Sequence, residues 1–220
     1  MMRARLVAFD LDGTLIDSHL DLADAANATL GAFGRGPLPA ATVAAMVGEG
    51  ARVLIERAFR ACDVTPPPTE ALEVFLRLYE ERLVVHTRPY AGIPATLAAL
   101  STHCRLAVLT NKPQHPAERL LDHFELARFF FRVIGGDTAW PRKPEPAALE
   151  SLMAEAGASP STTVLVGDSW IDHETAVRAR VRCCLARYGF GFSQIPPVRL
   201  RGDELVIDRP EDLLALVNER

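Results

Sequence analysis

Short apolar runs alternate with longer amphipathic segments along most of the chain. The first run is Leu6-Val7-Ala8-Phe9, and comparable runs occupy residues 106–109, 133–134, 164–166, 183–186 and 205–207. Between these runs the spacing of apolar residues favours helices over 94–100, 116–124, 145–156, 171–179 and 210–217, with Gly157 placed to end the third. Alternating strands and helices predict a parallel sheet with helices on both faces.

The alternation is interrupted directly after the first run. Residues 16–88 have helical spacing, clearest in the stripe Leu72, Phe75, Leu76, Tyr79 and Leu83, and no strand-like alternation. Breaks rich in Gly or Pro at 34–37, 48–50 and 66–68 divide the segment into about four helices. We expect an α/β fold with a Rossmann-like parallel sheet core, residues 1–15 and 89–220, and an inserted α-helical cap domain, residues 16–88, hinged near 16–18 and 88–90.

Composition narrows the class of protein. The chain has 220 residues, 49% hydrophobic and 24% charged, which is ordinary for a globular protein. A net charge of -4 with scattered Lys and Arg gives no sign of a nucleic-acid partner. No apolar run approaches the ~20 residues of a membrane span, and residues 1–5 lead straight into the first run without a leader-like region. We expect a cytoplasmic protein with reduced cysteines and no membrane partner; monomer and homodimer stay open.

Two carboxylates, Asp10 and Asp12, follow the first apolar run. Residues two apart lie on the same side of an extended strand, so both would point into one volume if the strand continued that far. Gly13 then lets the backbone turn. Two like charges that close need a cation or a proton between them. An Asp-rich turn is the alternative that this stretch alone leaves open.

Polar residues also end the later runs, and they are Thr110, Asn111, Lys143, Asp168 and Asp172. Each has a plainer interpretation, such as a helix cap, a solvated loop lysine or a first-turn carboxylate. Because the carboxyl ends of parallel strands share one edge of a sheet, we expect the whole set to converge there. Several carboxylates suit Mg²⁺, and a lysine with a hydroxyl suits a phosphoryl group. A carboxylate can attack phosphorus, and a second can move the proton.

On these residues the chain resembles the haloacid dehalogenase superfamily of phosphatases. The matching motifs are Asp10-Leu11-Asp12-Gly13-Thr14, Leu109-Thr110-Asn111, Lys143-Pro144 and Gly167-Asp168-Ser169 followed by Asp172. The helical insertion resembles the C1-type cap of that superfamily. Within it, the stretches Thr110-Asn111-Lys112-Pro113 and Tyr188-Gly189-Phe190-Gly191 are most similar to bacterial phosphoglycolate phosphatases. The chain departs from the family at Arg180, where Gly is usual.

The resemblance implies a role for each motif residue. Asp10 would be the nucleophile and a Mg²⁺ ligand. Asp12 would be the general acid and base, with its backbone carbonyl on the metal. Asp168 would be the third protein ligand, with Asp172 near the metal. Thr110, Asn111 and Lys143 would hold the phosphoryl oxygens.

We therefore expect a Mg²⁺-dependent phosphomonoesterase that acts through an aspartyl phosphate on a small phosphorylated metabolite, foremost 2-phosphoglycolate. Glu49 and Arg52, in the cap loop 47–52, are candidates for substrate choice. The Glu49 carboxylate would repel that of phosphoglycolate unless it points away or Arg52 compensates. A sugar phosphate or another small metabolite as substrate, a phosphomutase of the same superfamily, and a non-enzymatic phosphoryl-accepting receiver module are the alternatives. Receiver modules lack the large insertion and a carboxylate like Asp12.

Overall fold

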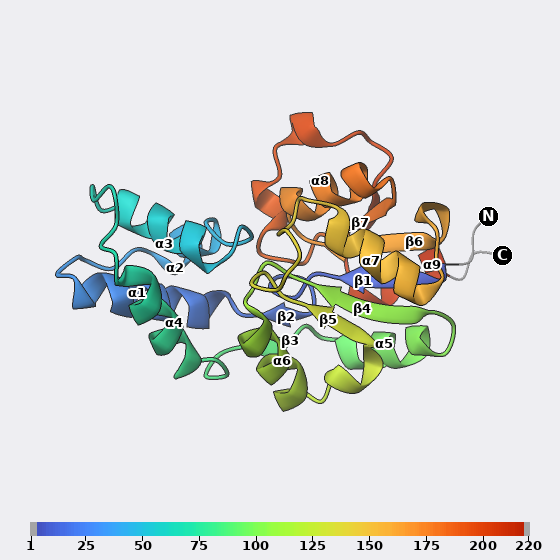
Figure 1. Ribbon diagram of the computed structural model, residues 1–220, viewed down its shortest axis with the longest axis horizontal. Helices are drawn as coiled ribbons and strands as arrows, with labels where there is room; N and C mark the ends of the chain where they lie inside the picture. Colours follow the sequence, from blue (N-terminus) through green and yellow to red (C-terminus); the bar gives the residue numbers. More distant parts are fainter. Residues whose placement is uncertain (1–3, 218–220) are drawn as a thin grey trace.

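The computed structural model describes residues 4–217, which form two lobes (Figure 1). One lobe is a helical bundle, drawn in blue to teal, and the larger lobe is a sheet covered by helices. Within residues 4–217, no helix combines the length and the apolar composition that crossing a membrane requires.

A six-stranded parallel sheet forms the centre of the larger lobe. Its strands are β1 (Leu6–Phe9), β4 (Arg105–Leu109), β5 (Arg132–Ile134), β6 (Thr163–Gly167), β7 (Arg182–Ala186) and β8 (Leu205–Ile207). They lie side by side in the order β5-β4-β1-β6-β7-β8, with every neighbouring pair parallel. Counted along the chain, that order is 3-2-1-4-5-6, the Rossmann arrangement. The α/β fold predicted from the sequence is confirmed.

Both faces of the sheet are covered, which explains why its strands read as continuous apolar runs. In β1, Val7 and Phe9 join one apolar cluster while Leu6 and Ala8 join another, as the alternation of a strand requires. The covering helices are α5 (Ile93–Ser101), α6 (Gln114–His123), α7 (Ala147–Ala156), α8 (Trp170–Ala179) and α9 (Leu213–Val217). Apolar residues of α5, α6 and α9 belong to the first cluster, and those of α7 and α8 belong to the second.

The helical lobe follows β1 directly. It contains α1 (His19–Ala32), α2 (Ala40–Ala44), α3 (Ala51–Arg60) and α4 (Ala71–Glu80). The chain enters and leaves it through an antiparallel pair, β2 (Ile16–Asp17) and β3 (Arg88–Pro89). The expectation of no strand in residues 16–88 is wrong for this pair, because two-residue strands from distant parts of the chain leave no alternation in the sequence. The predicted domain boundaries fall on this ribbon, and the division into domains stays a prediction.

Most predicted helix bounds differ from the observed ones by one or two residues, and two of the helices begin later than predicted. Helix α7 begins at Ala147 instead of residue 145, since Pro144 and Pro146 disfavour helical backbone in the residues before them. The last predicted helix, 210–217, starts as a 3-10 turn, η5 (Pro210–Asp212). The other 3-10 turns are η1 (Ala127–Phe129), η2 (Pro160–Thr162), η3 (Phe192–Gln194) and η4 (Pro197–Arg199).

Two helix ends use the left-handed conformation. Gly157 ends α7 with φ 60°, as predicted. Arg180 ends α8 with φ 59°, although a residue with a Cβ atom costs about 1–2 kcal/mol there. The departure from Gly at position 180 is therefore tolerated with the same backbone shape.

Candidate active site

The C-terminal edge of the sheet gathers the polar residues predicted from the strand ends. Asp10 follows β1, Thr110 follows β4 and Asp168 follows β6, and these three strands are neighbours at the centre of the sheet. Lys143 comes from the loop before α7, and Asp172 lies in the first turn of α8. All five side chains are buried. The sheet reverses its strand order here, which is where open α/β sheets bind their ligands.

Three carboxylates meet at this edge around one lysine. Oxygens of Asp10, Asp168 and Asp172 all lie within 4.8 Å of one another. The Lys143 Nζ lies 2.9 Å from Asp10 Oδ1 and donates to Asp172 Oδ1 at 2.6 Å. Asp172 also caps α8, because its Oδ2 accepts the Ser169 N–H at 3.1 Å and hydroxyl at 2.6 Å. Asp172 is thus a first-turn carboxylate of α8 and also a member of this carboxylate cluster.

The charges of this cluster do not balance without a cation or a proton. Burial raises the pKa of Asp10 to about 6, against the nearby Lys143 ammonium. Burial, with Asp172 and Asp10 close by, raises the pKa of Asp168 well above its usual range. Burial disfavours the charge on Lys143, but Asp10 and Asp172 outweigh it and raise the pKa of the ammonium group. One lysine faces three carboxylates, so a hard divalent cation with oxygen ligands fits the remaining charge.

The backbone packs tightly around Asp168. Its Oδ2 accepts the Gly191 N–H at 2.7 Å. A Cβ on Gly13, whose φ is +85°, would lie 2.0 Å from the same oxygen. A Cβ on Gly189 would lie 2.2 Å from the Gly13 carbonyl oxygen and 2.3 Å from Asp168 Cβ. The Gly189 segment after β7 thus fits against the turn after β1 only without side chains.

Asp12 is turned toward a separate group of residues. Strand β1 ends at Phe9, so the alternation of a strand does not reach Asp12, although Asp10 and Asp12 line the same cavity. Asp12 Oδ1 accepts the Ser18 hydroxyl at 2.6 Å, and both its oxygens accept from Lys112 Nζ at 2.9 Å. Lys112 Nζ also donates to the Tyr79 hydroxyl at 2.6 Å. The Asp12 carboxylate is therefore held at the junction of the two lobes.

Thr110 and Asn111 line the same edge. The Thr110 Oγ1 accepts the Lys112 N–H at 3.2 Å. The Asn111 amide donates to the Gly48 carbonyl of the cap at 2.9 Å and to the Lys143 carbonyl at 3.0 Å. Both amide hydrogens are thus engaged, so in this conformation the Asn111 side chain fastens the cap loop to the core.

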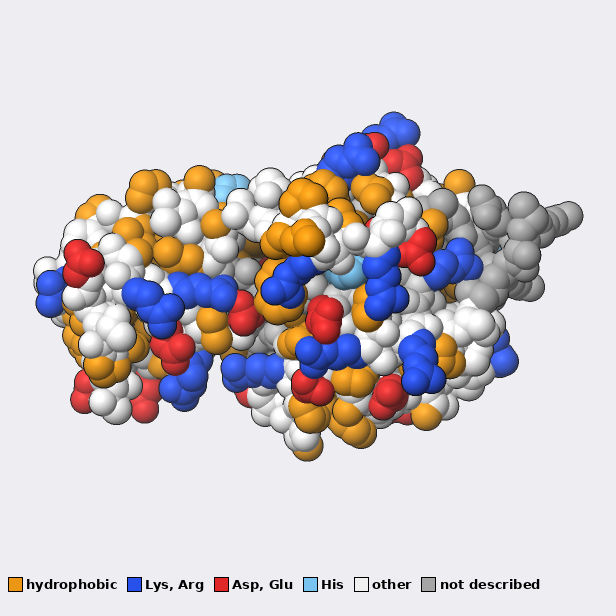
Figure 2. Space-filling view, turned by 90° about the horizontal axis from the view of Figure 1, so that it is seen from above, with side chains coloured by type: hydrophobic (Ala, Val, Ile, Leu, Met, Phe, Trp, Pro, Cys, Tyr) orange, Lys and Arg blue, Asp and Glu red, His pale blue; other side chains and the backbone are white. Residues whose placement is uncertain are grey.

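A cavity lies between the lobes, above the carboxylates. From the core it is lined by residues that include Asp10, Asp12, Lys112 and Asp168. From the cap it is lined by Leu22, Val47, Gly48, Gly50, Ala51, Leu54, Phe75, Leu76 and Tyr79. Figure 2 shows basic side chains on both lobes near the waist between them. Tyr79 is the one residue with a polar side chain among the described cap residues that line the cavity, and its hydroxyl lies 2.6 Å from the Nζ of Lys112, another lining residue.

The two cap residues expected to choose the substrate do not line this cavity. The Glu49 carboxylate pairs with Arg57 on α3, and Arg57 also donates to the Met46 carbonyl at 3.1 Å. Arg52 follows Ala51 but is absent from the lining set. Glu49 is thus neutralised by Arg57, not by Arg52, and neither expected residue contacts the cavity in this conformation.

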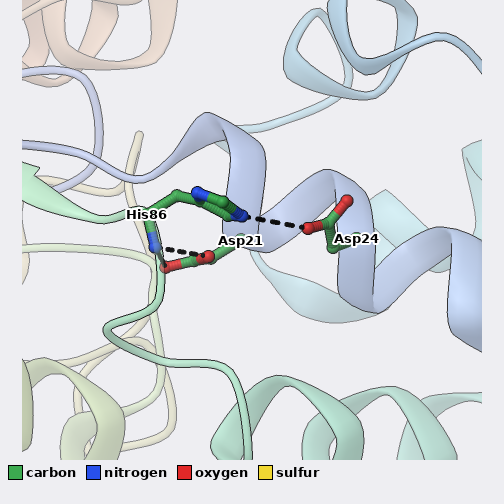
Figure 3. A group of neighbouring side chains, drawn as sticks. All are labelled: Asp21, Asp24 and His86. Carbon is green, nitrogen blue, oxygen red and sulfur yellow. Dashed lines mark hydrogen bonds and ion pairs between the residues drawn. The ribbon is translucent and has the colours of Figure 1, made fainter.

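A second group of metal-capable residues lies on the cap side, formed by Asp21, Asp24 and His86 (Figure 3). The buried Asp21 carboxylate already accepts the N–H groups of His86 and Thr87 at 2.8–3.0 Å and the Thr87 hydroxyl at 2.7 Å. Asp24 contacts only the His86 ring, at 3.6 Å. Asp21 therefore joins the start of α1 to the segment that leaves the cap.

Sequence reasoning missed the parts played by Lys112, Tyr79 and Ser18. Lys112 stands beside Thr110 and Asn111 in the motif, but its burial is visible only in the structure. Tyr79 fits the apolar stripe of α4, where its ring stacks on Phe75 with centroids 5.8 Å apart. The helical spacing that identifies core residues does not report where a hydroxyl points.

Comparison with known proteins agrees with this geometry. Residues 7–186 match the family of haloacid dehalogenase-like hydrolases, and the chain belongs to that family. It is a hydrolase of this family, and the candidate site described above lies at the C-terminal edge of its sheet.

Several relatives of the chain within that family are phosphatases by name. "Phosphoglycolate phosphatase 1" of Pseudomonas aeruginosa is 39% identical, over 98% of this chain and 80% of that protein. The phosphoglycolate phosphatase of Aquifex aeolicus is 36% identical, over 97% of both chains. The crystal structure of a predicted phosphoglycolate phosphatase from Haemophilus somnus superposes with a TM-score of 0.89 at 30% identity, over 99% of this chain and 100% of that one. The chain is accordingly a phosphatase.

Proposed function

We propose that the protein is a Mg²⁺-dependent phosphomonoesterase that transfers the phosphoryl group to Asp10 and then to water. The observation that carries this proposal is the position of the Asp10 carboxylate, which faces Lys143 and lies within 4.8 Å of Asp168 and Asp172. A lysine beside a carboxylate nucleophile offsets its repulsion from an anionic phosphate.

Asp10, Asp168 and the backbone carbonyl of Asp12 would hold the metal, with Asp172 beside them. The three buried carboxylates fit a cation that prefers oxygen ligands. Bound there, Mg²⁺ would neutralise negative charge on the phosphoryl oxygens. Lys143 would hold one of those oxygens, and Thr110 and Asn111 are the candidates for the others.

Asp12 would act as the general acid and the general base. In the first half of the cycle an Asp10 oxygen bonds to phosphorus, the ester P–O bond breaks, and protonated Asp12 gives its proton to the leaving oxygen. In the second half the Asp12 carboxylate takes a proton from the water that attacks phosphorus, the bond between the Asp10 oxygen and phosphorus breaks, and phosphate leaves with Asp10 restored as a carboxylate. The contacts of Asp12 with Lys112 and Ser18 suit its carboxylate form, the form required in the second half.

Residues 16–88 would act as a cap that excludes water from this chemistry. We favour 2-phosphoglycolate as substrate for two reasons. The relatives above carry that activity in their names. The cap wall of the cavity is apolar apart from Tyr79, so a sugar phosphate would leave several hydroxyls without partners. The cytoplasmic location, the oligomeric state and the absence of nucleic-acid partners stay predictions.

A phosphate-release assay over 2-phosphoglycolate and glucose 6-phosphate, with Mg²⁺ or with a chelator, tests the proposal. We expect turnover of 2-phosphoglycolate only with Mg²⁺ and loss of turnover in Asp10→Asn, while Asp24→Asn, an exposed carboxylate of the cap, keeps it. A hundredfold preference for the sugar phosphate would refute the substrate assignment. A need for a bisphosphate activator would indicate a phosphomutase instead.

A further inference from the structure

We propose that Tyr79 is the cap residue that recognises the substrate's carboxylate, with its hydroxyl donating a hydrogen bond to that group and Lys112 supplying the positive charge beside it. This inference rests on the proposed function, because it names the part of the substrate that is not the phosphate. It replaces the cap-loop residues Glu49 and Arg52 with a residue on α4.

The hydroxyl of Tyr79 has a hydrogen to offer. Its oxygen accepts from Lys112 Nζ at 2.6 Å. Among residues 4–217, no acceptor meets the phenol's own hydrogen. Burial, with Asp12, Asp21 and Glu80 nearby, raises the pKa of the phenol well above its usual range, so it stays protonated. A buried donor on a cavity wall is favourable only if the ligand brings an acceptor.

Lys112 places a positive charge beside the Tyr79 hydroxyl. The ammonium group is almost completely buried, with 3% of its side chain exposed, and it lies 4.5 Å from the centroid of the Tyr79 ring. Its three hydrogens have the two Asp12 oxygens and the Tyr79 oxygen as acceptors. Lys112 therefore polarises the hydroxyl toward a further acceptor, and its charge offsets a carboxylate arriving close to Asp12.

The remaining cap wall makes this contact selective. Leu22, Val47, Leu54, Phe75 and Leu76 line the cavity beside Tyr79. A short phosphorylated acid has one polar group apart from its phosphate, and the Tyr79 hydroxyl is the one polar side-chain group that this wall supplies. Substrates with more hydroxyls would bury them unpaired, which is how a site rejects them.

The experiment compares two substrates that differ only at that group. In ethyl phosphate a methyl group replaces the carboxylate of 2-phosphoglycolate. We would measure kcat/KM for both in the wild type, in Tyr79→Phe and in the matched control Tyr90→Phe, which removes a tyrosine hydroxyl outside the lining of the cavity. A hydrogen bond to a charged group is worth about 1.5–3 kcal/mol, which corresponds to about 10- to 150-fold.

We expect Tyr79→Phe to lower the ratio of 2-phosphoglycolate to ethyl phosphate at least tenfold, mostly through KM for the acid, and Tyr90→Phe to keep the wild-type ratio within twofold. A fall of less than fivefold in Tyr79→Phe, whether the two rates drop together or neither drops, would overturn the assignment. A wild type that hydrolyses both substrates equally would overturn it too, while leaving the phosphatase activity intact. Hydrolysis of neither would instead defeat the proposed function.

Discussion

Removing the charge of Asp21 offers the clearest test of how the entering and leaving segments of the cap are joined (Figure 3). Its carboxylate accepts from three donors on the segment that leaves the cap, namely the His86 N–H, the Thr87 N–H and the Thr87 hydroxyl. The substitution Asp21→Asn keeps the shape of the side chain but removes the charge and turns one acceptor atom into a donor. Asp21 is fully buried, so water cannot replace the lost acceptor.

The expected cost follows from those three contacts. Hydrogen bonds to charged groups are worth about 1 kcal/mol more than neutral ones, so three donors lose about 3 kcal/mol together. Asn carries no charge, so the variant avoids the cost of burying one, and this offsets part of the loss. The net decrease in unfolding free energy is about 2–3 kcal/mol. For a chain of this size we expect the melting temperature to fall by about 4–12 °C.

Asp24→Asn is the matched control. It is the same chemical change one helical turn away, but the Asp24 side chain is 56% exposed and contacts only the His86 ring. We expect it to change the unfolding free energy by less than about 0.5 kcal/mol. Denaturant titration and thermal melts of both variants measure the difference. Equal effects of the two substitutions would refute the conclusion that Asp21 joins the start of α1 to the segment that leaves the cap.

Three further expectations concern the site and the sheet. Asp12→Asn should bind substrate with little change in KM but lower kcat by ~10²-fold or more, the scale of general acid–base catalysis; near-normal turnover would exclude its proton role. Gly189→Ala should lower both melting temperature and activity, because its Cβ would lie 2.2 Å from the Gly13 carbonyl, and wild-type values in both assays would contradict that packing. Although burial opposes it, N–H groups of Arg201 and Gly202 and the ring of His173 lower the pKa of Glu204 to about 2. The stabilising effect of this carboxylate should be complete above pH 4.5 and fade toward pH 2. In urea titrations, Glu204→Gln should therefore lower the unfolding free energy more at pH 7 than at pH 3. An equal loss of unfolding free energy at the two pH values would contradict this.

The sheet and the candidate site could be predicted because strands that are buried on both faces appear in the sequence as short, continuous apolar runs. Every strand of the six-stranded sheet appears as an apolar run, and the residue after each central strand, Asp10, Thr110 or Asp168, is polar. Because the carboxyl ends of neighbouring parallel strands lie at the same edge of a sheet, the strand pattern alone predicts that these residues are close together. The helical insertion was predictable for the same reason, since the apolar spacing changes at residue 16.

Contacts of individual side chains within the cap and between the lobes could not be predicted, because they depend on the three-dimensional arrangement of the chain. The side chain of Glu49 pairs with Arg57, nearly two turns into α3, and nothing in the loop sequence distinguishes this from a contact with substrate. Tyr79 fits the core pattern of α4 with its ring, while its hydroxyl reaches Lys112 on the core. Residues of this kind, with an apolar body and a polar tip, satisfy two patterns at once.

The central claim is that Asp10 carries the phosphoryl group, and trapping that group tests it most directly. Asp12→Asn should form the intermediate from p-nitrophenyl phosphate, whose leaving group needs no proton, but should hydrolyse it slowly because the base is missing. Acid-quenched protein, digested and analysed by mass spectrometry, should then show one added phosphoryl group on the peptide that contains Asp10, together with a burst of nitrophenol. Nitrophenol release without a phosphorylated protein, or a phosphoryl group on another residue, would contradict the account.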